Sequence, residues 1–130
     1  MNRLLNIILF TFLLIAFTDC DDTVVQEVDN RTIPDSNVSF SKNISPIFEL
    51  KCNSCHGNGK TEAGLNLTSP AYFVDGIIVV PGEPDNSVLV WTIEWKAGFP
   101  SMPPPDYSVP LTSEQIRGVK TWITEGAKDN

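Results

Sequence analysis

Apolar residues recur at helical spacing just ahead of a cysteine-rich stretch. In "FSKNISPIFELKC" the apolar positions Phe40, Ile44, Ile47 and Phe48 repeat every three or four residues, which predicts an amphipathic helix. Pro46 fits only into the first turn of a helix, where its missing N–H leaves no hydrogen bond unmade. We therefore expect this helix to begin around residues 43–45.

Two further helices are predicted downstream. A short one follows the turn at Pro81-Gly82, with Asp85 as its expected N-cap and with the apolar positions Val88, Leu89, Trp91 and Ile93. The C-terminal one has Thr112 and Gln115 in capping-box positions and ends at Gly126, and its apolar stripe is Ile116, Val119 and Ile123. These short helices, with prolines and turns between them, predict an all-α domain.

The N-terminus has the pattern of an export signal. Arg3 precedes an apolar run from Leu4 to Phe17, which is too short for a comfortable membrane span and about right for a signal sequence. Cys20 follows and is succeeded by acidic residues, so the segment resembles a bacterial lipoprotein signal whose cysteine is lipidated. Asp19 departs from the small residue usual at that place, and the alternative is ordinary cleavage that leaves Cys20 as a free thiol. We expect a signal peptide over residues 1–19 and lipidation at Cys20.

Residues 20–39 are polar and acidic and lack helical periodicity. They predict a flexible tether between the anchor and a domain over residues 40–130. At 130 residues the chain has room for one such domain. Its net charge of -7 and the lack of a basic patch argue against nucleic acid binding, and favour protein partners with basic docking faces.

The stretch "KCNSCHGNGK" contains the candidate chemistry. Cys52 and Cys55 are three residues apart and His56, the only histidine, follows at once. On a helix all three share one face. Two thiols at this spacing can add to two vinyl groups of a haem while the histidine reaches the iron, and C-x-x-C-H is the signature of c-type haem attachment.

Three other interpretations compete for this motif. A zinc site needs four ligands, usually in two pairs, and the sequence has no second pair. A thioredoxin-like motif belongs at the start of a helix in a βαβ unit, which this sequence does not predict. A structural disulfide between Cys52 and Cys55 leaves His56 without a role.

Met102 is the candidate for a second axial ligand. It is the only methionine other than Met1, and it lies among prolines in "GFPSMPPPDY". A thioether is a known partner of histidine in cytochromes c, and the prolines stiffen the loop that would hold it. The alternative is a methionine that fills a gap in the core.

From Phe40 to about Ala127 the sequence resembles class I c-type cytochrome domains, in particular the planctomycete-type subfamily. The matching strings are "F…I.PIF…C..CHG", "GLNL", "VPGEPDNSVLV", "MPP" and "LT..QI..VKTWI.EGA". The resemblance implies a small class I cytochrome c-like fold in which N- and C-terminal helices pack around one covalently attached haem c. It also implies His56 and Met102 as axial ligands, and a proline carbonyl, from Pro70 or Pro81, that accepts a hydrogen bond from His56 Nδ1.

The function expected from these features is single-electron transfer outside the cytoplasm. The chain would be a periplasmic or cell-surface lipoprotein, held to a membrane by its lipid, that exchanges electrons with a donor and an acceptor protein. It would not be an enzyme, because the one histidine is taken and two protein ligands leave no open iron position. The alternatives are a haem-based ligand sensor or weak peroxidase with a displaceable Met102, and a non-haem module stapled by a disulfide.

Overall fold

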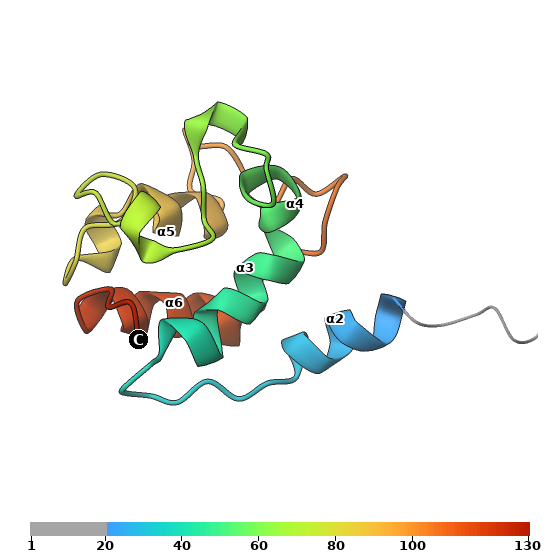
Figure 1. The fold of residues 1–130 in the computed structure, drawn as a ribbon, viewed down its shortest axis with the longest axis horizontal. Coiled ribbons are helices and arrows are strands. Elements are labelled where there is room, and N and C mark those ends of the chain that lie inside the picture. Colours follow the sequence, from blue (N-terminus) through green and yellow to red (C-terminus); the bar gives the residue numbers. More distant parts are fainter. Residues whose placement is uncertain (1–20) are drawn as a thin grey trace, which may run out of the picture.

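The computed structural model describes residues 21–130, which form helices, single helical turns and loops without any strand (Figure 1). The α-helices are α2 (Asp21–Asp29), α3 (Ser45–Lys51), α4 (Asn53–His56), α5 (Val88–Ile93) and α6 (Ser113–Thr124). The single turns are the π-helix η2 (Phe40–Ile44) and the 3-10 turns η3 (Glu62–Gly64), η4 (Pro70–Tyr72) and η5 (Pro84–Asn86). The predicted all-α class is confirmed. The predicted signal peptide and Cys20 lie outside the described residues.

Helix α3 begins where the sequence predicts. Pro46 occupies its first turn, and Ser45 is its first residue. The π-helical turn η2 leads directly into α3, with the Ser39 hydroxyl accepting a hydrogen bond from the backbone N–H of Lys42. Apolar side chains from both elements, including Ile47 and Phe48, point into the core.

Helix α6 follows its local sequence signals closely. Thr112 and Gln115 form the complete capping box, with both reciprocal hydrogen bonds present. Val119 and Ile123 are fully buried, and Gly126 follows the helix with a φ of +101°. Such a φ favours glycine, so the stop signal is the one expected.

The expected N-cap of α5 is wrong. Asp85 lies within the 3-10 turn η5, and α5 starts later, with Ser87 as its N-cap. The Ser87 hydroxyl makes no capping bond. It accepts a hydrogen bond from the backbone N–H of Val80 and donates one to the carbonyl of Glu83, so it braces the preceding turn.

Four aromatic rings form the centre of the core. Phe40, Phe48, Phe73 and Trp122 are buried, and their ring centroids lie 5.5 to 6.3 Å apart. Tilted pairs at this separation add to the stabilisation from burial alone. The cluster joins the adjacent elements η2 and α3 to the end of η4 and to α6, which are distant in the sequence, and so connects the segments that surround the site described below.

The segment before Phe40 differs from the flexible tether that the sequence predicts. Val28, Ile33 and Val38 are buried, and Figure 1 shows this segment running along the molecule from α2 to η2. Glu125 accepts hydrogen bonds from the backbone N–H groups of Asn37 and Val38, at 2.6 and 2.8 Å. The packed domain therefore starts about twelve residues before the predicted boundary, since Val28 rather than Phe40 is its first buried apolar residue.

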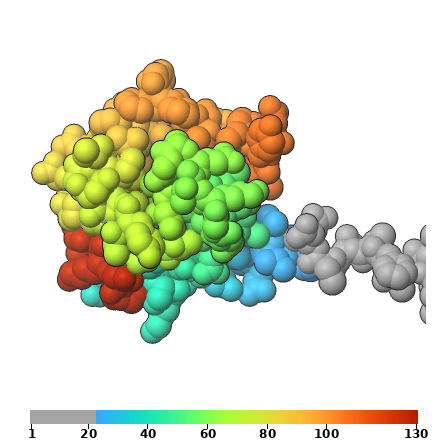
Figure 2. Space-filling view, turned by 45° about the horizontal axis from the view of Figure 1, so that its top comes forward, coloured from blue at the N-terminus to red at the C-terminus, as the bar shows by residue number. Residues whose placement is uncertain are grey.

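None of the described helices is long and apolar enough to span a membrane. Figure 2 shows α2, in blue, at the edge of the molecule.

Candidate functional site

The cysteine motif spans a break between two helices. We expected one continuous helix through His56, but α3 ends at Lys51 and α4 starts at Asn53, because Cys52 has a non-helical φ of -124°. Helical hydrogen bonds still cross the break, from Cys52 N to Phe48 O at 2.9 Å and from His56 N to Cys52 O at 2.9 Å. The turn is therefore kept, and the predicted shared face of the motif survives the break.

A single cavity brings the predicted site residues together. Cys52, Cys55, His56 and Met102 all line it, and its volume is about 230 Å³. The walls are largely apolar and come from residues 65–67, from α5 and from the loop of Met102: Leu65, Leu67, Leu89, Ile93, Pro103 and Pro104.

The two ring nitrogens of His56 have different surroundings. Nδ1 is buried and has no hydrogen-bond partner among the described residues. Nε2 is therefore the nitrogen that can face the cavity, and it is the one that could hold an iron atom.

Neither predicted proline carbonyl accepts from His56 Nδ1. The carbonyl of Pro70 already accepts hydrogen bonds from the backbone N–H groups of Phe73 and Val74, at 3.2 and 2.8 Å. Pro81 lies exposed in a turn whose next residue, Gly82, binds the carbonyl of Ile123 in α6. The hydrogen bond inferred from related domains is therefore not made in this structure.

The two thiols are free and are not joined in a disulfide. Burial raises the pKa of Cys52 to about 12, so at neutral pH this group is a protonated thiol rather than a thiolate. Among residues 21–130 there is no group of three or more His, Cys, Asp or Glu side chains that could hold a metal ion.

Met102 is fixed to helix α5 through its backbone. Its N–H donates to the carbonyl of Thr92 at 3.0 Å, and its carbonyl accepts from the indole N–H of Trp95 at 3.3 Å. The thioether therefore enters the cavity from a backbone position that is held on both sides. A methionine that only fills the core would be buried, whereas Met102 is half-buried and lines the cavity.

These residues fit a haem better than any other group considered. Two thiols and an imidazole come from one turn, a thioether comes from a separate loop, and apolar side chains surround them. A comparison with protein-family models gives a match over residues 52–106, which include all four of these residues. The match is with planctomycete cytochrome C. No curated protein and no solved structure matches the chain significantly.

The predicted resemblance to planctomycete-type cytochromes c is thus confirmed over the matched segment. A cytochrome c domain implies covalently bound haem c and a haem-binding electron carrier rather than an enzyme. Cys52 and Cys55 are present in the planctomycete cytochrome C segment at the spacing that attachment needs.

Three residues that support the site could not be predicted from the sequence. Lys51 lines the cavity although its side chain is almost fully buried. Thr92 and Trp95 hold Met102 in place, but their roles depend on how α5 packs against the loop. No local pattern could have identified them, since each acts on a residue seven to ten positions away or on another segment.

Proposed function

We propose that this protein is a monohaem cytochrome c that carries single electrons between redox partners outside the cytoplasm. The observation that carries the proposal is that Cys52, Cys55, His56 and Met102 meet at one apolar cavity. The haem, when bound, supplies a one-electron redox centre. The roles of the side chains follow from their chemistry.

Each of the four residues has a separate task in this proposal. The thiols of Cys52 and Cys55 would each add across one vinyl group of a haem, which gives two thioether bonds and consumes no oxidant. His56 Nε2 and the Met102 thioether would hold the iron. A thioether raises the reduction potential relative to a second imidazole. The leucines of the cavity wall would exclude water from the bound group.

The carrier is favoured over a ligand sensor or weak peroxidase by the way Met102 is held. A sensor needs a displaceable sixth ligand. Here the Met102 backbone is hydrogen-bonded on both sides, to Thr92 and to Trp95. The disulfide-stapled module is disfavoured because both thiols are free.

Location and partners belong to the same proposal. The signal-like N-terminus and Cys20 favour an exported lipoprotein, periplasmic or at the cell surface, anchored to a membrane. The net charge of -7 favours donor and acceptor proteins with basic docking faces, whose association would be sensitive to salt. Tyr107 lines the cavity and is 85% exposed, so a partner that docks there approaches the redox centre closely.

The test uses Met102→Ala in a host that matures c-type haem. A fixed thioether should leave the wild type low-spin in both oxidation states and slow to bind carbon monoxide when reduced. Met102→Ala should bind carbon monoxide readily and have a lower reduction potential. The measurements are a carbon monoxide difference spectrum and a redox titration. Val109→Ala, an exposed residue of the same connection, controls for disturbance of the loop. Rapid stoichiometric binding by the wild type would favour the sensor instead.

A further inference from the structure

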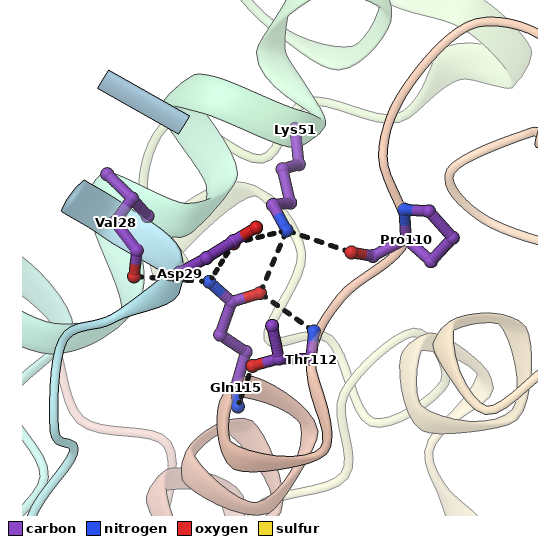
Figure 3. A network of polar contacts seen from close by, with 6 residues as sticks. All are labelled: Val28, Asp29, Lys51, Pro110, Thr112 and Gln115. Atoms are coloured by element: carbon purple, nitrogen blue, oxygen red, sulfur yellow. Dashed lines mark hydrogen bonds and ion pairs between the residues drawn. The ribbon is translucent and has the colours of Figure 1, made fainter. Parts of the chain in front are cut away.

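Lys51, one of the residues that line the cavity, has a buried positive charge. It is the last residue of α3 and directly precedes Cys52, and its side chain is only 1% exposed. Its ammonium group has three acceptors, namely Asp29 Oδ1 at 2.6 Å, the Pro110 carbonyl at 2.8 Å and Gln115 Oε1 at 3.1 Å (Figure 3). An ammonium group has three N–H donors, so every donor is used.

The other atoms of this network are also committed. Gln115 Oε1 accepts from the backbone N–H of Thr112 in the capping box, and Gln115 Nε2 donates to Asp29 Oδ1 at 2.9 Å. Figure 3 shows the side chains of Asp29, Lys51 and Gln115 converging from three helices. Gln115 thus connects the ion pair to α6 and holds both charges in one arrangement.

Asp29 is in a position that its own helix disfavours. It is the last residue of α2, and the last turn of that helix has no basic residue. A carboxylate at the C-terminal end of a helix lies next to the negative end of the helix dipole. The ammonium group of Lys51 is what makes this position favourable, because it is the only cation bonded to Asp29 among the described residues.

The pair matters for redox chemistry because Lys51 also lines the cavity that contains Cys52, Cys55 and His56. Reduction adds one electron to a haem. A nearby positive charge in a low-dielectric interior stabilises the reduced form, whereas a negative charge stabilises the oxidised form. The ammonium group of Lys51 and the carboxylate of Asp29 therefore act in opposite directions.

We infer that Asp29 is a positioning residue that sets the reduction potential of the haem through Lys51. The carboxylate compensates the charge of Lys51 and so lowers the potential that the ammonium group alone would produce. This inference rests on the proposed function, because it needs a haem in the cavity. By this inference, α2, the first described helix, contributes to the redox site through the charge of Asp29.

The experiment compares single and double variants of the full-length haem protein. Asp29→Asn keeps an oxygen acceptor for Lys51 but removes the negative charge, so the equilibrium constant for reduction should rise, on the order of fivefold. Lys51→Met should lower this equilibrium constant, and the value for the double variant should lie between those of the two single variants. Lys51→Arg keeps the charge and should stay close to the wild type. Redox titrations measure the reduction potential of all four variants and of the wild type.

The matched control lies on the same helix. Glu27 pairs with Arg31 at 3.1 Å, and both side chains are largely exposed. Solvent screens such a pair, so Glu27→Gln should leave the potential unchanged. Hydrogen exchange of the backbone amides in residues 25–33 reports, independently of the haem, whether α2 stays docked in each variant.

Opposite shifts for Asp29→Asn and Lys51→Met, with α2 still protected from exchange, support the inference. Unchanged potentials, or shifts of the same sign, overturn it and leave the network as a structural contact alone. A wild type without covalent haem would overturn the proposed function itself. That result is distinguishable, because it is read from the wild-type spectrum before any variant is compared.

Discussion

At Gly57 the chain leaves α4 so close to its neighbours that a methyl group has no room. A Cβ at this position would lie 2.8 Å from Cβ and Cγ of Asn53 and 2.9 Å from Cγ2 of Thr68. The φ of Gly57 is -169°, ordinary extended backbone, so the requirement is for space and not for a special backbone conformation. Gly57 directly follows His56, and the same contact therefore positions the candidate axial ligand.

Gly57→Ala should destabilise the protein by about 1–3 kcal/mol, the usual cost of overpacking. The haem potential should shift as well, because α4 carries His56. Thermal unfolding and a redox titration measure the two effects. The control is Gly59→Ala, where a Cβ meets nothing within 4 Å but φ is +88°. It should lose stability through backbone strain and leave the potential unchanged. Equal effects of both variants on the potential would contradict this account of Gly57.

At the scale of single residues, the sequence predicts those whose role follows from their own residue type and spacing. Cys52, Cys55 and His56 could be recognised because covalent attachment needs a fixed spacing, and Met102 because it is the one methionine outside the signal segment. Lys51 and Trp95 could not be recognised. Their roles come from partners such as Asp29 and Met102, which only tertiary packing brings near.

Between elements, the N-terminal segment packs closely against α6 at Gly118. A Cβ on Gly118 would lie 2.6 Å from Cδ1 and 2.8 Å from Cγ2 of Ile33. The same two segments exchange hydrogen bonds, from Ile33 N to Glu114 at 3.1 Å and from Arg117 to the Ile33 carbonyl at 2.6 Å. The glycine therefore creates the groove in α6 that accepts Ile33.

Gly118→Ala should lower the stability of the protein that has Ile33 and raise the stability of the Ile33→Ala variant. With Ile33 present the methyl group clashes, and the protein should lose about 1–3 kcal/mol of stability. With Ile33→Ala only the contact to Cβ at 3.3 Å remains. The better helix propensity of alanine, up to about 1 kcal/mol, should then dominate. Urea unfolding of the four proteins measures this cycle. A stabilising effect in both backgrounds would show that Ile33 does not pack against Gly118 in solution.

The elements that the sequence predicts well are those with signals inside one segment. Helix α6 has its capping box, stripe and glycine stop within fifteen residues. The packing of residues 28–39 could not be predicted, because their partners Glu114, Gly118 and Glu125 lie more than eighty residues away. Their polar composition favoured a tether, while backbone hydrogen bonds to acidic side chains decide the observed structure.

On the scale of the whole molecule, the proposed anchor Cys20 comes shortly before the packed domain in the sequence. The buried segment starts by Val28, so few residues separate Cys20 from the packed surface. A lipid on Cys20 would hold the domain near the membrane rather than at the end of a long tether. The approach of redox partners would then be restricted to the faces turned away from the lipid.

Cys20→Ser tests this anchoring in the native host. One acyl chain binds a membrane only marginally, so stable retention requires more than one on the cysteine. The wild type should fractionate with membranes, and the variant should be released or should stall in processing. Cys55→Ser, which leaves the signal untouched, is the control for loss of a cysteine as such. A processed Cys20→Ser protein that stays membrane-bound would place the anchor elsewhere.

The central claim is that Cys52 and Cys55 attach one haem, and intact-mass spectrometry tests it most directly. The wild type, purified from a host that matures c-type haem, should exceed the mass of its processed and lipidated polypeptide by the mass of one haem. Its reduced spectrum should be that of a low-spin c-type cytochrome. Cys52→Ala combined with Cys55→Ala should lose the added mass. A wild type that lacks the mass of a haem, or a double variant that keeps it, would contradict the account.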